Sequence, residues 1–216
     1  MSEPKNSEHA LRLAIAAFNA QQYEAAERSL DEILMVNGND AAALQLKAML
    51  CLRRGDVDLA RSAILNCIKL RPNHPPSFKV MLEVAKARFA QAHQARETSN
   101  ATAAIGFYRD ALQLNPGLAA AWFGLGLVLQ DDKDYAAAAD AFAQAAKLEP
   151  SDAKAHVNRG ISLQQTGNIT EAFAAYQAAY QRDASTFGAI SQALTSASTG
   201  ALVLNLDKLA LRLAKI

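Results

Sequence analysis

Apolar residues recur along most of the chain at spacings of three and four, the period of amphipathic helices. Their order repeats every 34 residues, with one longer interval of 44. One column of this repeat is always alanine, and a large apolar residue follows it four positions later. The two columns are Ala26, Ala60, Ala104, Ala138 and Ala172, and then Leu30, Ile64, Tyr108, Phe142 and Tyr176. Helices that cross at roughly 8–10 Å leave no room for a long side chain at the crossing, so the pattern predicts closely packed helix pairs.

Two further columns mark where the helices begin and end. Helix-breaking residues close the repeats at Gly38, Pro72, Pro116 and Pro150, because proline cannot continue a helix. Ahead of each second helix stands a residue whose side chain can cap free backbone N–H groups. This capping column is Asp56, Asn100, Asp134 and Asn168, with the weaker Gln22 in the first repeat.

The fourth repeat carries a recognisable motif. Trp122-x2-Leu125-Gly126-x2-Leu129 is followed by Ala138-x3-Phe142 and Pro150, and this series resembles the tetratricopeptide-repeat (TPR) family. The resemblance implies an all-α fold: a right-handed α-solenoid of about five TPR helix pairs, a C-terminal capping helix and a tail. It also implies a surface that holds another protein rather than a catalytic pocket. The first-helix columns are looser, and His156 and Leu82 depart from them.

The repeat register divides the chain. A TPR solenoid is expected over residues 7–198, and an apolar C-terminal tail packed on it over 200–216. The repeats are placed at 7–40, 41–74, 75–118, 119–152 and 153–186, and the cap helix at 187–199.

The third repeat is ten residues too long. The register places the surplus near Arg88 to Glu97, where the apolar stripe of the first helix continues through Phe89 and Ala92. We therefore expect one long helix from about Ser77 to about Glu97, the ten added residues lengthening it by ~15 Å. A flexible surface insertion is the alternative.

Composition and charge argue against nucleic-acid binding and membrane association. The 216 residues are 51% hydrophobic with a formal net charge of +1, which lacks the broad basic field of nonspecific nucleic-acid binding. The first ten residues have no apolar segment of the signal-peptide kind, and no run of 18 apolar residues occurs. We expect a cytoplasmic protein without integral membrane association.

Residues suited to chemistry are few and scattered. Cys51 and Cys67 occupy packing columns, which favours small buried side chains over a redox pair. The four histidines show no ligand spacing, and no nucleophile or zinc-protease motif appears. We expect no metal, no cofactor and no enzymatic activity.

The expected partner surface follows from the resemblance, because first helices line the concave face of TPR proteins. The corresponding columns are mostly apolar in the first and last repeats and charged in the middle one. As a set they are more apolar than a groove that faces water and binds no partner would be. Coverage of some positions by neighbouring helices is the alternative. TPR co-chaperones that bind the C-terminal carboxylates of heat-shock proteins carry Lys and Asn on successive first helices, followed by a Lys and Arg pair. This set is incomplete here, and its nearest match is Lys154 with Asn158. The candidate contacts are Leu11, Ile15, Phe18, Met49, Leu52, Lys79, Glu83, Lys86, Phe123, Leu127, Val157 and Ile161.

The C-terminal tail is unusually apolar. Leu202, Leu204 and Leu206 alternate as in an extended segment, and Leu206, Leu209, Ala210 and Leu213 fit a helical stripe. So short a segment with few charges favours packing on protein over lying on a membrane. The hypothesis is that it docks on the last repeat, in the protein's own groove, or in the groove of a second copy.

These observations favour a non-catalytic adaptor or chaperone-like scaffold that binds a segment of another protein, or a peptide, in its concave groove. The alternative is a self-assembling scaffold, a homo-oligomer formed through the groove, the long helix or the tail. An RNA-binding helical repeat is less favoured, because such proteins surround RNA with positive charge and polar side chains.

Overall fold

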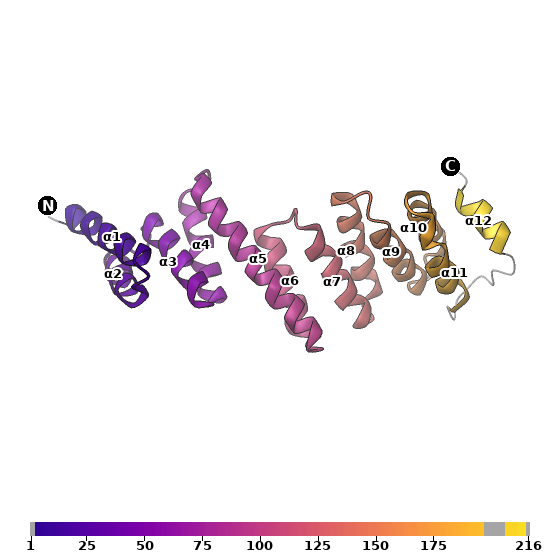
Figure 1. The fold of residues 1–216 in the computed structure, drawn as a ribbon, viewed down its shortest axis with the longest axis horizontal. Coiled ribbons are helices and arrows are strands. Elements are labelled where there is room, and N and C mark those ends of the chain that lie inside the picture. The colour runs from indigo at the N-terminus through magenta and orange to yellow at the C-terminus, as the bar shows by residue number, and fades with distance from the viewer. Residues whose placement is uncertain (1–2, 197–205, 215–216) are drawn as a thin grey trace. The chain divides into compact units, whose positions relative to one another are not determined.

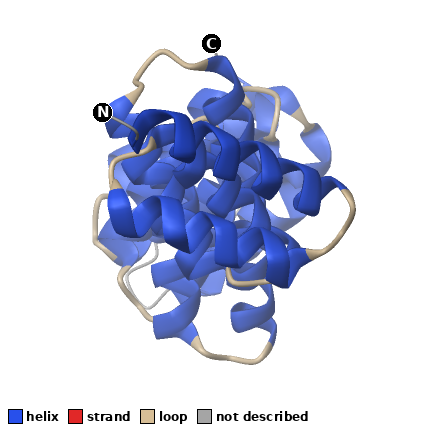
Figure 2. Cartoon of the chain, turned by 90° about the vertical axis from the view of Figure 1, so that its left-hand side faces the viewer, coloured by secondary structure: helices blue, strands red, loops and turns tan. Residues whose placement is uncertain are grey.

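The computed structural model describes residues 3–196 and 206–214, and within them the regular structure is helical throughout (Figures 1 and 2). The chain divides into two compact units, residues 1–88 and 89–216. The helices are α1 (Glu3–Asn19), α2 (Tyr23–Val36), α3 (Ala41–Arg54), α4 (Val57–Leu70), α5 (Pro75–Glu97), α6 (Ala101–Leu114), α7 (Ala119–Asp131), α8 (Tyr135–Leu148), α9 (Ala153–Gln165), α10 (Ile169–Arg182), α11 (Phe187–Ser196) and α12 (Leu206–Ala214), with a 3-10 turn at Ala184–Thr186. The predicted all-α fold of consecutive helix pairs is confirmed.

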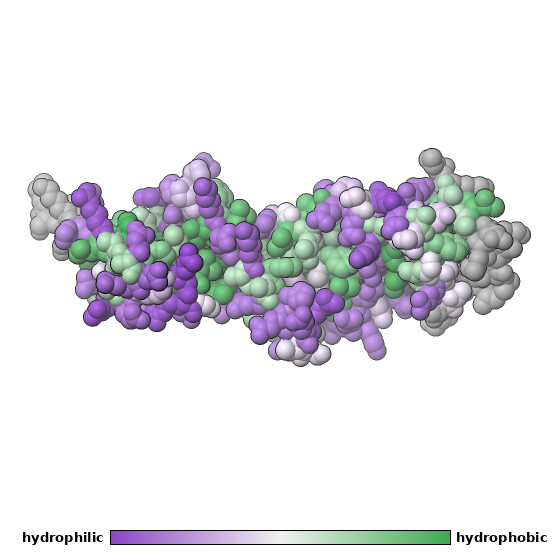
Figure 3. Space-filling model, viewed as in Figure 1, coloured by the Kyte–Doolittle hydropathy of each residue, from purple (hydrophilic) through white to green (hydrophobic). Residues whose placement is uncertain are grey.

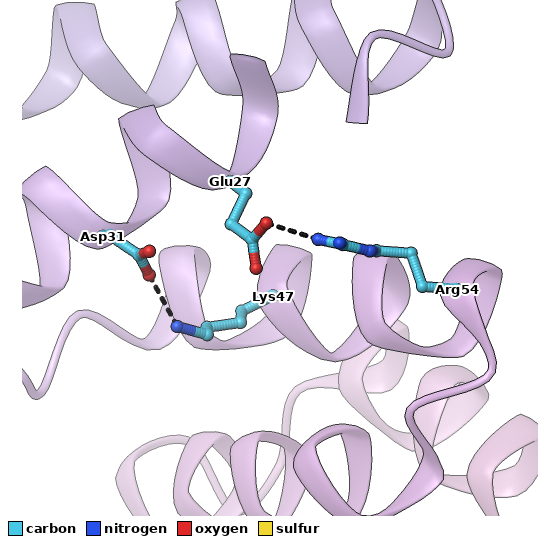
Figure 4. A network of polar contacts seen from close by, with 4 residues as sticks. All are labelled: Glu27, Asp31, Lys47 and Arg54. Atoms are coloured by element: carbon cyan, nitrogen blue, oxygen red, sulfur yellow. Dashed lines mark hydrogen bonds and ion pairs between the residues drawn. The ribbon is translucent and has the colours of Figure 1, made fainter. Parts of the chain in front are cut away.

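The first unit contains the pairs α1/α2 and α3/α4 and the N-terminal half of α5. Its core includes Ala14 and Leu30, which pack with Leu46 and Leu50 of α3. Two ion pairs join α2 to α3, Asp31 with Lys47 (2.6 Å) and Glu27 with Arg54 (Figure 4). All four side chains are partly exposed, so the pairs contribute little stability and mainly favour one register between the repeats.

The second unit contains α6 to α12 and the C-terminal half of α5. Small residues on first helices receive aromatic rings from second helices. A Cβ atom at Gly126 would lie 2.7 Å from Cε1 of Phe142, and one at Gly160 would lie 2.4 Å from Cε1 of Tyr176. Real Cβ atoms do not approach this closely, so both positions require glycine as the rings are placed.

Helix α5 is a continuous helix of 23 residues, whereas α3, α4 and α6 to α10 have 13 or 14. The predicted long helix is confirmed, and the flexible insertion is not seen. The prediction that the ten surplus residues lie near Arg88 to Glu97 was wrong, because residues of this segment pack against α6 as a first helix of the repeat does. Ala92 is fully buried in the cluster that holds Tyr108, and the Phe89 ring lies 6.0 Å from the Tyr108 ring.

The physical reason is the space beside Tyr108. Counted back from Gly126 by 34 residues without a gap, the small-residue column falls on Ala92. The sequence-based register instead put Leu82 there, but Leu82 is 39% exposed. The N-terminal half of α5 belongs to the first unit, where Ser77 Oγ donates a hydrogen bond to Gln45 Oε1 (2.9 Å) and Arg88 pairs with Asp58 of α4.

The turn inside each helix pair is held by the backbone. Five residues spaced by the repeat have positive φ angles, and the N–H that follows each donates to a carbonyl five residues earlier, as from Asp134 to Leu129 (2.8 Å). This bonding closes a helix end without any side chain. The positive-φ residues are Gln21, Gly55, Ser99, Lys133 and Gly167.

The capping column is only partly used. Asn100 Oδ1 accepts from the Ala103 N–H and Asp134 Oδ1 from the Ala137 N–H, as predicted. Asp56 and Asn168 form no such bond, so the prediction was wrong there. Because the backbone bond already sets the turn, the capping side chain adds to it and is not required.

Both cysteines are buried and unpaired with each other, as expected. Cys67 Sγ donates a hydrogen bond to the Ala41 carbonyl (3.2 Å). Burial raises the pKa of the Cys51 thiol, which lowers the fraction of reactive thiolate. These side chains therefore act as packing groups.

The C-terminal end is built from α9, α10, α11 and α12. Tyr176 donates its hydroxyl hydrogen to Gln164 Oε1 (2.8 Å), and Gln164 Nε2 donates to the Ala193 carbonyl (3.0 Å), which ties α11 to α9. Leu209 and Leu213 of α12 are buried in the same core cluster. The extended segment expected from Leu202 to Leu206 falls mostly in 197–205, outside the described residues.

His156 occupies the position in its repeat that Trp122 occupies in the preceding one, but the hydrogen bonds around the two side chains differ. In the preceding repeat, Trp122 Nε1 donates to the Pro116 carbonyl (2.9 Å). One repeat later the Pro150 carbonyl accepts from Arg182 Nε (2.5 Å). Burial lowers the pKa of His156, and the charges of Arg182 and Arg159 lower it further.

The first prediction concerns the glycine at the helix crossing. Gly126→Ala should destabilise the second unit, because overpacking costs about 1–3 kcal/mol against about 0.5–1 kcal/mol regained from helix propensity. Gly106→Ala is the matched control, since no heavy atom lies within 4 Å of its added Cβ, and it should stabilise the protein. The free energy of unfolding in urea, followed by circular dichroism, measures both. Equal shifts in the two variants would contradict the argument.

The second prediction concerns pH. The pKa of His156 is lower in the folded than in the unfolded protein, so the unfolded state binds more protons once the pH falls below about 6.5. Stability should therefore be intact above that pH and decline as the pH falls towards the folded pKa. His156→Phe removes the titrating group, so its unfolding midpoint should depend less on pH than that of the wild type. Parallel pH profiles for the two proteins would show that His156 is not responsible.

Candidate partner-binding grooves

A groove in the first unit lies between α3 and the N-terminal half of α5. Its volume is about 750 Å3, within the range of pockets that hold ligands. It brings together five of the predicted contact residues, Met49, Leu52, Lys79, Glu83 and Lys86. Apolar side chains reach the face shown in the space-filling view between more extensive polar ones (Figure 3).

The rim of this groove is positively charged. Lys86 Nζ donates to Glu83 Oε1 (2.8 Å) in an exposed pair on one helix. Arg53 and Lys79 line the same groove, and neither has a hydrogen-bonding or ionic partner in the described part of the chain. Three cationic groups thus stand against one carboxylate, around Met49 and Leu52.

Sequence reasoning missed four residues that line this groove, Arg53, Val80, Leu82 and Ala87. Arg53 directly follows Leu52 in the last turn of α3, and its position in the helix could have indicated it. Leu82 was assigned to the small-residue column, but a leucine there should have signalled that no aromatic ring packs against it. Its side chain instead adds apolar surface to the groove.

A second groove, of about 360 Å3, lies within the second unit between the C-terminal half of α5 and α7. It contains the predicted residues Phe123 and Leu127. Opposite them stand Phe89, His93 and Arg96, which sequence reasoning did not select. These three are the equivalents of Phe123, Leu127 and Gln130 when the 34-residue period is continued without a gap, so the signal was present.

The second groove is electrically more balanced than the first. His93 and Arg96 line one part of it, and Glu149 and Asp152 another. His93 Nδ1 also lies 3.3 Å from Glu97 Oε1, and Asp152 accepts from the Lys154 N–H at the start of α9. Tyr108 forms part of the wall, and burial raises its pKa. Aromatic surface rather than charge therefore distinguishes this groove.

The remaining predicted contacts are dispersed. Leu11 and Phe18 are half-buried against the core of the first unit, whereas Ile15 is exposed on α1. Ile161 lines a smaller hollow of about 250 Å3 with residues of α11. Val157 is only 7% exposed and belongs to the core of the second unit, which leaves it little surface for a partner.

The described residues offer no group of three or more histidine, cysteine, aspartate or glutamate side chains arranged to hold a metal ion. Among the same residues, no helix combines the length and the apolar character needed to cross a bilayer.

Comparison with known proteins identifies the repeat. A family model described as a tetratricopeptide repeat matches residues 11–75, 89–142 and 123–186, well over half of the chain. The second match begins at Phe89, in agreement with the pairing of the C-terminal half of α5 with α6. The chain belongs to the tetratricopeptide-repeat family, whose helix pairs form scaffolds for protein–protein interaction.

Individual relatives are more distant. The human protein O-mannosyl-transferase TMTC1 is 30% identical over 146 residues, which are 67% of this chain but only 16% of that protein. Among solved structures, a crystal structure of MamA has 16% identity and a TM-score of 0.45, covering 85% of this chain and 94% of that one. A MamA fragment from Desulfovibrio magneticus RS-1 has 19% identity and a TM-score of 0.40, covering 83% and 96%.

Proposed function

We propose that this tetratricopeptide-repeat protein is a non-catalytic adaptor whose α3–α5 groove binds a partner segment with carboxylates beside an apolar side chain. The observation that carries the proposal is the pair Arg53 and Lys79. Both are exposed cations, without a partner among the described residues, on the rim of a groove that also presents Met49 and Leu52. An acidic and apolar segment satisfies both features at once.

The two kinds of contact have different roles. Burying one leucine-sized side chain of the partner against Met49 and Leu52 stabilises the complex by about 1.5–3 kcal/mol. An exposed ion pair contributes about 0–1 kcal/mol, but charges accelerate encounter and exclude partners of the wrong sign. The apolar contact therefore supplies most of the affinity, and Arg53 and Lys79 supply the selectivity.

The groove of the second unit supports a broader scaffold role. Phe89 and Phe123 offer aromatic surface for a second apolar segment, and the balanced charges around them impose less selection by sign. Two grooves of moderate affinity in one chain bind a partner with two such segments more tightly than either does alone, where geometry allows both to be engaged. A chaperone-like protein that holds exposed apolar segments uses the same surfaces.

The third prediction tests the charge selectivity. Three labelled peptides of equal length, with leucine interspersed among glutamate, glutamine or lysine, are titrated and followed by fluorescence anisotropy. The glutamate peptide should bind most tightly, and added salt should weaken it most. The double variant Arg53→Glu with Lys79→Glu should lose roughly tenfold or more of that affinity, because attraction becomes repulsion.

The control is Lys69→Glu with Arg28→Glu, which changes the net charge of the first unit equally. Lys69, like Arg53, lies in the last turn of its helix, and both control residues are exposed on second helices away from the groove. This variant should bind the glutamate peptide almost as the wild type does. If all three peptides bind equally, or if both double variants lose affinity equally, the proposed groove is wrong.

A further inference from the structure

A third groove lies in the second unit between α6 and α8, the second helices of two successive repeats, which both pack on α7. Its volume is about 600 Å3. Trp122, Leu125 and Leu129 of α7 form its apolar floor. They lie on a different face of α7 from Phe123 and Leu127, which line the groove beside α5. One first helix thus presents apolar side chains to two separate surfaces.

The two walls of this α6–α8 groove carry opposite charges. Arg109 stands on the α6 wall and Asp140 on the α8 wall, and both are exposed. Neither has a hydrogen-bonding or ionic partner in the part of the chain that the structure describes. Ala137 and Ala141 add short side chains to the α8 wall, which lets another backbone approach closely. The groove therefore combines an apolar floor with one cationic and one anionic wall.

The next repeat shows that the fold does not impose this combination. The residues 34 positions after Leu125 and Ala137 are both charged. They are Arg159 and Glu171, which form an ion pair at 3.9 Å. The two charged residues of the walls, by contrast, both correspond to alanine one repeat later. The apolar lining and the charged walls are thus properties of the α6–α8 groove and not of the repeat.

A helix fits this groove better than an extended segment does. The groove is built from helices whose backbone N–H and C=O groups are bonded within them, so they offer no backbone partners to an extended chain. A helix bonds its own backbone and needs only apolar side chains one turn apart to cover the floor. Trp122 is already held by the hydrogen bond from its Nε1 to the Pro116 carbonyl (2.9 Å), so its side chain loses little freedom on binding.

We propose that the α6–α8 groove binds an amphipathic helix of another protein, with carboxylates on one flank of its apolar stripe and lysine or arginine on the other. The carboxylates face Arg109, the cations face Asp140, and the stripe covers Trp122. Opposite charges on the two walls select against helices whose flanks carry a single sign. This site is separate from the α3–α5 groove and takes a partner of balanced charge instead of an acidic one.

The first experiment uses Trp122, the only tryptophan of the chain, as the reporter. Three tryptophan-free helical peptides of about 18 residues, or five turns, share one leucine stripe. Their flanks carry glutamate on one side and lysine on the other, glutamate on both, or lysine on both. The mixed peptide should shift the Trp122 emission to shorter wavelength and bind roughly tenfold more tightly than the other two. No shift with any peptide, or equal affinity for all three, would overturn the proposal.

The second experiment blocks the groove. Ala137→Lys places a long side chain on the α8 wall, one turn before Asp140, with which its ammonium group can pair. It should weaken binding of the mixed peptide by roughly tenfold or more, because it fills the space of the stripe and neutralises the anionic wall. Ala136→Lys is the matched control, since Ala136 is an exposed residue of the same first turn outside the groove, and it should bind as the wild type does. Equal losses in the two variants would refute the site.

Reversing the charge of one wall should change the preferred peptide. Arg109→Glu makes both walls anionic, so the peptide with two lysine flanks should now bind most tightly. Asp140→Lys makes both walls cationic and should favour the peptide with two glutamate flanks. A variant that is folded by circular dichroism and keeps the wild-type preference would contradict the assignment of the walls.

Two further measurements detect a different occupant. A proline in the middle of the mixed peptide breaks its helix and should abolish the emission shift, whereas unchanged affinity would show that an extended segment binds and that the proposal is wrong. The protein alone should keep a constant Trp122 emission as its own concentration rises. A shift would identify a second copy as the occupant and overturn the proposal. Arg53→Glu with Lys79→Glu should leave all these results unchanged, so the site is tested independently of the α3–α5 groove.

Discussion

The close crossing of paired helices is the constraint on which the rest of this structure depends. At each crossing a small residue of the first helix packs against an aromatic or aliphatic side chain of the second, and at Gly126 and Gly160 there is no space even for a methyl group. The distance between the two helices is therefore set by the absence of a large side chain on the first helix. Once this distance is fixed, the side chains on the opposite face of each first helix are directed away from the pair, and these side chains line the grooves.

The repeat pattern made most of the fold predictable, because alanine and glycine at a crossing tolerate few replacements. The helix pairs, their order and the length of α5 follow from such columns. The register inside α5 did not follow, because two registers compete there: Phe78 keeps the period that begins in the first unit, and Ala92 keeps the period of the second. The structure uses both, one in each half of the helix. Only the fit of Ala92 beside Tyr108 decides which half pairs with α6.

The same ambiguity explains which site residues could be predicted. Lys79, Glu83 and Lys86 lie in the half of α5 for which the first register holds, and the structure places them in one groove with Met49 and Leu52. Phe89, His93 and Arg96 lie in the half governed by the second register, so they were passed over as inserted residues. The turns were not predicted either. Gln21, Ser99 and Lys133 adopt positive φ angles there, which are uncommon for residues other than glycine.

The long helix also accounts for the contrast between the two grooves. A helix that serves two units presents two different inward faces, and here one carries two lysines and a glutamate while the other carries a phenylalanine, a histidine and an arginine. Repeats of normal length would have spread these side chains over two separate helices. The interruption of the repeat therefore lets one helix contribute side chains to a cationic site in one unit and to an aromatic site in the other.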